Sequence, residues 1–226
     1  MRRDGVMSSP QIRPSPIGRI VGILVVLFAG LVFLPAAGRA EGADAADSVR
    51  AFYDVLLSTM RDGAQLGERG RYAKLEPVIL KVFDIPYMTR MAVGPSWSAT
   101  PQLKQQQVAE AFGRYITATW ADRFDSYSGE KLEVTGVQPY AAGALVHTRI
   151  VKPNGEPVAI DYLMRRNGDA WQIADVYLTG TISELATRRS EFSSVLRSQG
   201  IDALIAVLNR KAGTMVSAAL PSDPGS

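Results

Sequence analysis

Apolar residues over positions 47–124 recur three or four places apart, so that they gather on one face of each segment. This spacing predicts a first helix over Asp47–Met60, capped at its start by Asp47. A polar, glycine-containing loop is expected to follow, as far as about Arg71. A short helix around Leu75–Val82 comes next in the pattern.

Two further helices are predicted from residues that favour helix ends. Asp84 stands two places before Pro86, and Gly94 closes the apolar pattern, which predicts one short capped helix over Asp84–Gly94. The pair Thr100-Pro101 opens a longer helix in the same way, and its apolar face ends at Phe124.

The period changes to two from Leu132 onward, which indicates β-strands. Short turn signals separate the strands, and such connections leave no room for helical crossovers. The sequence therefore predicts an antiparallel meander of four strands. Their expected bounds are Leu132–Pro139, Ala144–Lys152, Pro157–Asn167 and Ala170–Thr179.

The helical period returns near the C-terminus. One segment runs from Ile182 to Gly200 and a second from Ile201 to Gly213, and a small, polar tail, 214–226, is expected to be disordered. Helices before and after an antiparallel sheet predict one α+β domain, with a curved four-stranded sheet covered by helices. Such a sheet can enclose an apolar pocket.

The N-terminal segment has the pattern of an export signal. Ile20–Leu34 is an uncharged apolar run of 15 residues, preceded by four arginines and followed by small residues that end at Ala40. A membrane-spanning helix needs about 20 apolar residues, so the run is short for an anchor. We predict a signal peptide over residues 1–40, cleaved after Ala40, and a domain over 41–213. The alternative is an uncleaved N-terminal anchor.

The export segment also accounts for the basic charge of the chain. The whole sequence has 25 Lys and Arg against 22 Asp and Glu. Five of these bases and one acid fall within residues 1–40, which leaves 20 bases against 21 acids in the remainder. The charge therefore gives no reason to expect a nucleic-acid partner.

Residues suited to catalysis or metal binding are few. The chain has no cysteine and one histidine, His147, so thiol chemistry and a histidine metal site are not expected. Asp161 and Asp175 are the carboxylates that an apolar pocket could use as a general base. The alternative is that Asp161 faces solvent, while Asp175 pairs with an arginine such as Arg188 or Arg189 and fixes the following helix. The basic pairs 165–166 and 188–189 read as solvated faces, or as contacts for an anionic head group or acidic partner.

Four motifs in order resemble one protein family. They are FDIPYMTRMAVGPSW (Phe83–Trp97), TPQLKQQQVAEAFGRYITATWADRF (Thr100–Phe124), GDAWQIADVYLTG (Gly168–Gly180) and RRSEFSSVLRSQGIDALIAVL (Arg188–Leu208). Their order and spacing look like the MlaC (toluene-tolerance) family of periplasmic phospholipid carriers, over about Asp47–Arg210. The sequences of Phe83–Trp97 and of residues 126–130 look closest to those of the hopanoid-associated HpnM branch.

The resemblance implies a nuclear-transport-factor-2-like fold with a deep apolar cavity that holds lipid tails, the head group lying near its mouth. It implies lipid as cargo, with no cofactor and no family catalytic residues. It also implies a periplasmic location and two partners, an inner-membrane ABC transporter complex and an outer-membrane lipoprotein complex.

The residues expected to line this pocket come from two helices and one face of the sheet. A β-bulge would move any of the sheet residues to the opposite face, and any single member could instead belong to the core. The helix candidates are Met88, Met91, Phe112, Tyr115, Ile116 and Trp120, and the sheet candidates are Val146, Ile150, Ile160, Tyr162, Met164, Trp171 and Ile173.

Three hypotheses about function follow. The first is a periplasmic carrier of phospholipid or a hopanoid-type lipid. The second is a small enzyme that uses the same pocket, with Asp161 or Asp175 as general base. The third is a non-catalytic partner subunit that stays tethered to a membrane.

Overall fold

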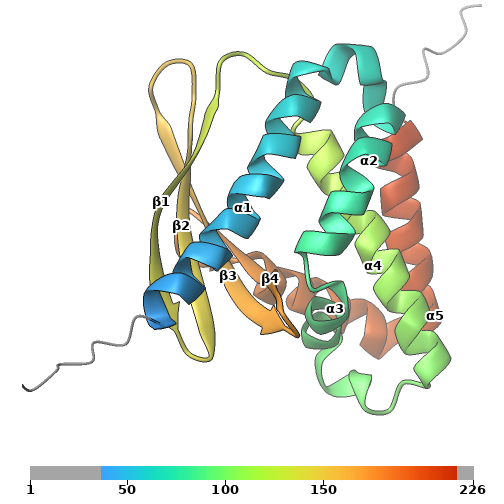
Figure 1. Ribbon diagram of the computed structural model, residues 1–226. Helices are drawn as coiled ribbons and strands as arrows, with labels where there is room; N and C mark the ends of the chain where they lie inside the picture. The colour runs from blue at the N-terminus through green and yellow to red at the C-terminus, as the bar shows by residue number, and fades with distance from the viewer. Residues whose placement is uncertain (1–36, 218–226) are drawn as a thin grey trace, which may run out of the picture. The chain divides into compact units, whose positions relative to one another are not determined.

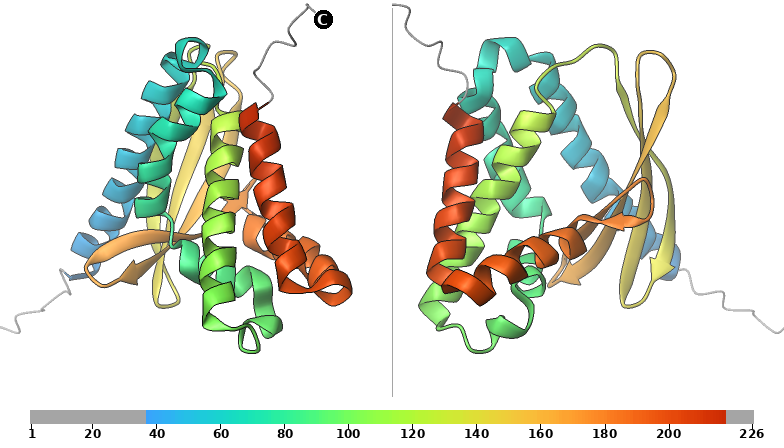
Figure 2. Two further views of the ribbon diagram at one scale, coloured as in Figure 1. Left: turned by 90° about the vertical axis from the view of Figure 1, so that its right-hand side faces the viewer. Right: turned by 180° about the vertical axis from the view of Figure 1, so that it is seen from behind.

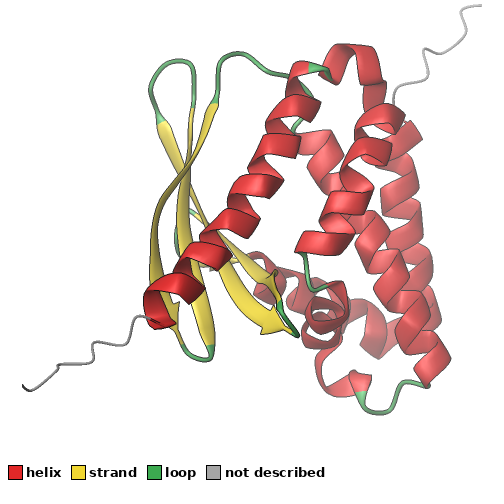
Figure 3. Ribbon diagram, viewed as in Figure 1, coloured by secondary structure: helices red, strands yellow, loops and turns green. Residues whose placement is uncertain are grey.

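The computed structural model describes residues 37–217, which form an α+β domain with a single antiparallel sheet (Figures 1 and 3). The helices are α1 (Ala37–Arg61), α2 (Gly63–Val82), α3 (Ile85–Val93), the 3₁₀ helix η1 (Gly94–Trp97), α4 (Gln102–Arg123) and α5 (Glu184–Ser217). The strands are β1 (Lys131–Tyr140), β2 (Gly143–Val151), β3 (Pro157–Asn167), β4 (Ala170–Leu178) and β5 (Ile182–Ser183).

The five strands follow one another in the sheet in chain order, and each pairs antiparallel with the next. Helix α1 runs diagonally across the twisted sheet, and α2, α4 and α5 lie side by side beyond it (Figures 1 and 2). The core fills the space between these two layers. The rings of Phe52, Phe83 and Trp120, from three separate segments, meet edge to face there with centroids 5.0 to 5.9 Å apart.

The predicted meander is confirmed, and β1 to β4 each lie within one residue of their expected bounds. The expectation of four strands is wrong by one. The two-residue strand β5 pairs with the end of β4, with Ile182 opposite Leu178, in a place where the helical pattern had been expected to begin. A strand this short carries no period of its own, so the spacing of apolar residues could not reveal it.

The short helix α3 is also confirmed, together with both of its caps. The Asp84 carboxylate accepts a hydrogen bond from the Tyr87 amide at 3.1 Å, and Pro86 occupies the first turn. Gly94 follows the helix with φ of 67°, a conformation that glycine adopts without steric cost. Asp84 also forms an ion pair with Arg165 of β3, which ties this helix to the sheet.

Helix α1 begins ten residues before the predicted start, so Asp47 does not cap it. The segment before Asp47 is rich in alanine, the best helix former, and Ala45 and Ala46 are buried against the sheet layer. Asp47 instead lies exposed within the helix and pairs with Arg50 one turn later, at 2.6 Å.

The predicted loop to Arg71 is wrong, because α2 begins at Gly63. Gly67 interrupts it with φ of 58°, so two helical segments meet there. The buried Arg71 side chain donates to the carbonyls of Gly63, at 3.2 Å, and of Ala121 in α4, at 2.9 Å. These bonds hold the start of α2 against the end of α4, and they are long-range contacts that a local pattern does not encode.

The two predicted C-terminal helices meet at Gly200, which has φ of 79°, and together they form the kinked helix α5. The helix continues through Gly213 to Ser217, so the first four residues of the tail expected to be disordered are helical. Residues 1–36 and 218–226 lie outside the described part of the chain, which leaves the predicted signal peptide and the rest of the tail as predictions. None of the helices described between residues 37 and 217 has the length and apolarity required to cross a bilayer.

The close approach between the start of α2 and the segment that follows α4 gives a test of this packing. A Cβ atom on Gly63 would lie 2.0 Å from the Asp125 carbonyl oxygen, so Gly63→Ala is expected to lower the free energy of unfolding by about 3 kcal/mol. Gly213→Ala is the matched control, because Gly213 has open space around it within a helix, and the change should raise stability by up to about 1 kcal/mol. Urea unfolding measures both; equal effects of the two substitutions would contradict the close approach at Gly63.

Candidate functional site

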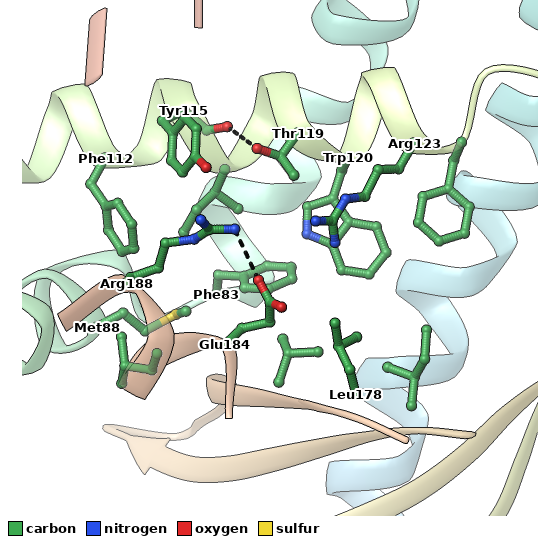
Figure 4. A pocket seen from close by; sticks show the side chains of 15 residues that line it. Phe83, Met88, Phe112, Tyr115, Thr119, Trp120, Arg123, Leu178, Glu184 and Arg188 are labelled. Atoms are coloured by element: carbon green, nitrogen blue, oxygen red, sulfur yellow. Dashed lines mark hydrogen bonds and ion pairs between the residues drawn. The ribbon is translucent and has the colours of Figure 1, made fainter. Parts of the chain in front are cut away.

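An apolar cavity of about 820 Å³, its open mouth included, lies between α4 and the sheet (Figure 4). The enclosed part of this space is about 180 Å³, and the remainder is open to solvent. Helix α4 supplies one wall, the ends of β3 and β4 the opposite wall, and the start of α5 a third side. The lining residues are Phe83, Met88, Phe112, Tyr115, Ile116, Thr119, Trp120, Arg123, Phe124, Ile160, Val176, Leu178, Glu184, Leu185 and Arg188.

The α4 wall is a single stripe of side chains at helical spacing, from Phe112 to Arg123 and the Phe124 cap. Aromatic contacts hold this wall in place. Trp120 stacks on Phe124 with ring centroids 4.9 Å apart, and Phe112 meets Phe192 of α5 edge to face with ring centroids 5.6 Å apart. The wall is therefore a preformed apolar surface about 18 Å long, at 1.5 Å per helical residue.

A β-bulge in β4 determines which residues form the sheet wall. Met164 of β3 is opposite Ile173, whereas Leu163 is opposite Asp175, so Ala174 is an extra residue in β4. The alternation along β4 therefore shifts by one residue, so that Val176 and Leu178, rather than Asp175 and Tyr177, share the sheet face of Ile173 and Ile160.

The charged part of the lining is concentrated on α5 and at the end of α4. Arg188 donates to Glu184 at 3.0 Å and to Glu191 at 3.1 Å, and its guanidinium lies 5.3 Å from the centre of the Tyr115 ring. Figure 4 shows the ion pair of Arg188 and Glu184 among the lining side chains, with Trp120 and Arg123 further along α4. The Thr119 hydroxyl donates back to the Tyr115 carbonyl at 2.8 Å, so it is already satisfied within the helix.

Six of the thirteen predicted pocket residues line this cavity, and seven do not. The six are Met88, Phe112, Tyr115, Ile116, Trp120 and Ile160. Val146, Tyr162, Met164 and Ile173 are fully buried in the core, where Tyr162 meets Tyr53 of α1, and Trp171 is also buried in the core. Ile150 packs against the edge of the core, and Met91 is 37% exposed on α3. Whether any of the thirteen binds a ligand stays a prediction.

Nine residues line the cavity but were not predicted to do so, and local structure explains most of these omissions. Strict alternation from Ile173 leads to Asp175 and Tyr177, and only the bulge at Ala174 brings Val176 and Leu178 to the cavity instead. Thr119, Arg123 and Phe124 continue the spacing of Phe112–Trp120 and could have been included on that basis. Phe83 and Glu184 lie at chain junctions where no period exists. Leu185 belonged to the helical segment predicted from Ile182 but was not assigned to the pocket, and Arg188 had been considered as half of a basic pair and as a partner of Asp175.

The two carboxylates considered as general bases do not line the cavity. Asp161 faces away from α4, accepts a hydrogen bond from the Thr148 amide, and lies 3.0 Å from Nδ1 of His147. His147 and Asp161 are opposite each other on the face of the sheet that points away from α4. The expectation that Asp161 faces solvent is wrong, since only 8% of it is exposed.

Asp175 fixes the start of α5, as expected, but through different partners. Its carboxylate accepts hydrogen bonds from the Leu185 amide at 3.0 Å and the Ser183 hydroxyl at 2.6 Å, and Ser183 in turn caps the helix by accepting from the Ala186 amide. The predicted pairing with Arg188 or Arg189 is wrong: Arg188 binds two glutamates, and no ion pair joins Asp175 to Arg189 in the described part of the chain. Burial raises the pKa of the Asp175 carboxyl above its ordinary value, although these hydrogen bonds oppose the shift.

Among residues 37–217, no group of three or more His, Cys, Asp or Glu side chains is arranged to hold a metal ion.

Two comparisons with known proteins bear on the family and on the fold of this chain. The family model described as MlaC protein matches residues 50–210 of this chain. Among solved structures, the chain is similar to the phospholipid-binding protein from Ralstonia solanacearum in complex with a phospholipid, with a TM-score of 0.67 and 21% sequence identity. That match covers 76% of this chain and 98% of the other, and at this identity it shows a shared fold.

Asp175 provides a test that separates a structural from a chemical role. Asp175→Ala removes the acceptor for two buried amides, so it should lower the free energy of unfolding by about 2 kcal/mol, whereas Ser183→Ala should cost about 1 kcal/mol. Asp175→Asn keeps one oxygen for both amides and should be milder. Because the pKa of Asp175 is raised in the folded state, wild-type stability relative to Asp175→Asn should fall as the pH rises above 3.8.

Urea unfolding at several pH values measures these differences. Loss of lipid transfer between vesicles in Asp175→Asn, with unchanged stability, would instead indicate a chemical role.

Proposed function

The chain belongs to the MlaC family, and from that premise we propose that it is a lipid carrier whose cavity shields acyl chains from water. The observation that carries this proposal is the cavity between α4 and the sheet, which is lined almost entirely by aromatic and aliphatic side chains and opens to solvent. Its few charged residues lie on α5 and at the end of α4, where the polar part of an amphipathic molecule could remain hydrated.

Such a carrier must offset the large free-energy cost of exposing an acyl chain to water. Leaving an acyl chain in water costs about 0.8 kcal/mol for each exposed CH₂, or roughly 13 kcal/mol for a tail of about 16 carbons. A protein that buries the tail removes most of this cost without any chemical step. The carrier then needs only an apolar cavity and a route by which the lipid enters and leaves.

Phospholipid is the cargo class that the comparison favours. The Ralstonia solanacearum protein is described as phospholipid-binding and in complex with a phospholipid, and almost its whole length shares the fold of this chain. A hopanoid-type lipid is the second cargo to test, because the Phe83–Trp97 motif resembles the HpnM branch.

In this proposal the carrier works in the periplasm between two membranes. It would exchange lipid with an inner-membrane ABC transporter complex and with an outer-membrane lipoprotein complex. The N-terminal pattern supports export, and cleavage after Ala40 would remove only four residues of α1. The buried contacts of Ala45 and Val49 with the core would remain.

Filling the cavity should block lipid binding. Leu178 lines the cavity and is only partly buried, so Leu178→Trp should occupy space that a tail requires and lower lipid occupancy at least about five-fold. Leu103→Trp is the matched control, because Leu103 is 64% exposed on α4 and lies outside the cavity. Mass spectrometry of lipid extracted from equal amounts of each protein measures occupancy. Equal occupancy in the two variants, with both folded, would contradict the proposed cavity.

The export prediction has a separate test. Expressed from its full gene in a Gram-negative host, the protein should appear in the periplasmic fraction with an N-terminus at Glu41. N-terminal sequencing together with cell fractionation gives the result. A chain that begins at Met1 and sediments with membranes would instead favour the tethered-subunit hypothesis.

A further inference from the structure

Arg123 places a charged side chain in the lining of a cavity that is otherwise mainly apolar. It occupies the last turn of α4, one residue before the Phe124 cap, and it is exposed at the rim of the cavity. Figure 4 shows its side chain extending from α4 among the residues that line the cavity. An arginine directed outward into solvent would not line the cavity in this way.

The other arginine of the lining is already neutralised. Arg188 binds Glu184 and Glu191, and Lys211 lies 3.9 Å from the same Glu191 carboxylate. These two cations and two anions balance one another. An acidic ligand at Arg188 would have to displace a carboxylate that is already hydrogen-bonded to the guanidinium.

Arg123 has no such partner within the described part of the chain. Its guanidinium makes no hydrogen bond, ion pair or ring contact there, so the cavity lining carries one uncompensated positive charge. A guanidinium has five N–H donors in a planar fork, which matches the oxygens of a phosphate or a carboxylate. An anion held at this position would also be next to the open side of the cavity, where the rest of a polar head group stays hydrated.

We propose that Arg123 binds the acidic group of the cargo, a phosphate or a carboxylate, at the α4 C-terminal end of the cavity. This inference rests on the proposed lipid-carrier function and adds an orientation to it. The acyl chain then runs along the apolar stripe of α4, away from Arg123 and toward Phe112 and Met88. Arg123 is thus a residue that selects cargo with an acidic head group over neutral lipids of equal tail length.

The competing explanation is that Arg123 only complements the negative end of the α4 dipole. Arg90 provides the comparison, because it too is an exposed arginine in the last turn of a helix, α3, and it does not line the cavity. Arg123→Lys retains the charge at the helix end while losing the planar fork. These two variants separate ligand binding from helix stabilisation.

The experiment is titration calorimetry of the exported domain, freed of bound lipid, with three soluble probes. Dioctanoyl phosphatidylglycerol carries a phosphate, decanoate carries a carboxylate, and dioctanoylglycerol carries neither. Arg123→Gln should weaken binding of the matching acidic probe about three- to ten-fold, a modest factor because the site is exposed to solvent. Binding of dioctanoylglycerol should not change, and Arg90→Gln should bind all three probes like the wild type. Arg123→Lys should recover part of the loss.

Each outcome decides between the explanations. A loss for phosphatidylglycerol alone identifies a phosphate as the bound group, and a loss for decanoate alone identifies a carboxylate. An equal loss for dioctanoylglycerol, or no loss for either acidic probe, overturns the inference while leaving the carrier function in place. If the wild type binds none of the three probes, the proposed carrier function itself fails.

Discussion

One extra residue in β4, Ala174, sets the geometry on which the candidate site depends. Before it, Ile173 faces the core; after it, Val176 and Leu178 face α4 and form the sheet wall of the cavity. The same bulge turns the Asp175 carboxylate toward the start of α5, which it fixes by hydrogen bonds. The first turn of α5 then carries Glu184, Leu185 and Arg188 to the edge of the cavity. A single irregularity thus determines both the sheet wall of the cavity and the anchoring of α5 beside it.

The cavity exists because the helices cover the sheet unequally. Helix α1 fills one part of the buried face, where Tyr53 meets Tyr162, while α4 lies against the end of β3 and β4 without filling the space between. The apolar walls of such a cavity lack part of the packing contacts that stabilise a core. A ligand with an apolar tail supplies those contacts. This is the physical reason to connect the cavity with lipid binding rather than with incomplete packing.

The sequence predicted those elements whose ends are determined by residues close together in the chain. The Asp84 and Gly94 caps of α3 and the short turns between β1 and β4 are encoded within a few residues, and the structure has them where they were expected. The contacts that were missed depend on distant residues. Arg71 binds a carbonyl of α4, the bulge at Ala174 reverses the alternation of β4, and β5 exists only by pairing with β4. Six candidates on α3, α4 and β3 line the cavity, but Tyr162 and Met164, which share the face of Ile160 on β3, are buried in the core instead. The period of a strand identifies its buried face, whereas the part of that face left open to a cavity depends on which distant helices cover it.

The central claim is that this cavity holds the tail of a lipid. Its most direct test is native mass spectrometry of the protein purified, without added lipid or detergent, from the cells that produce it. If the cavity holds a lipid tail, the spectrum should contain a complex heavier than the polypeptide by the mass of a lipid, which fragmentation releases and identifies. A spectrum that contains only the bare polypeptide, from a folded protein that also takes up no lipid when mixed with vesicles, would contradict the claim.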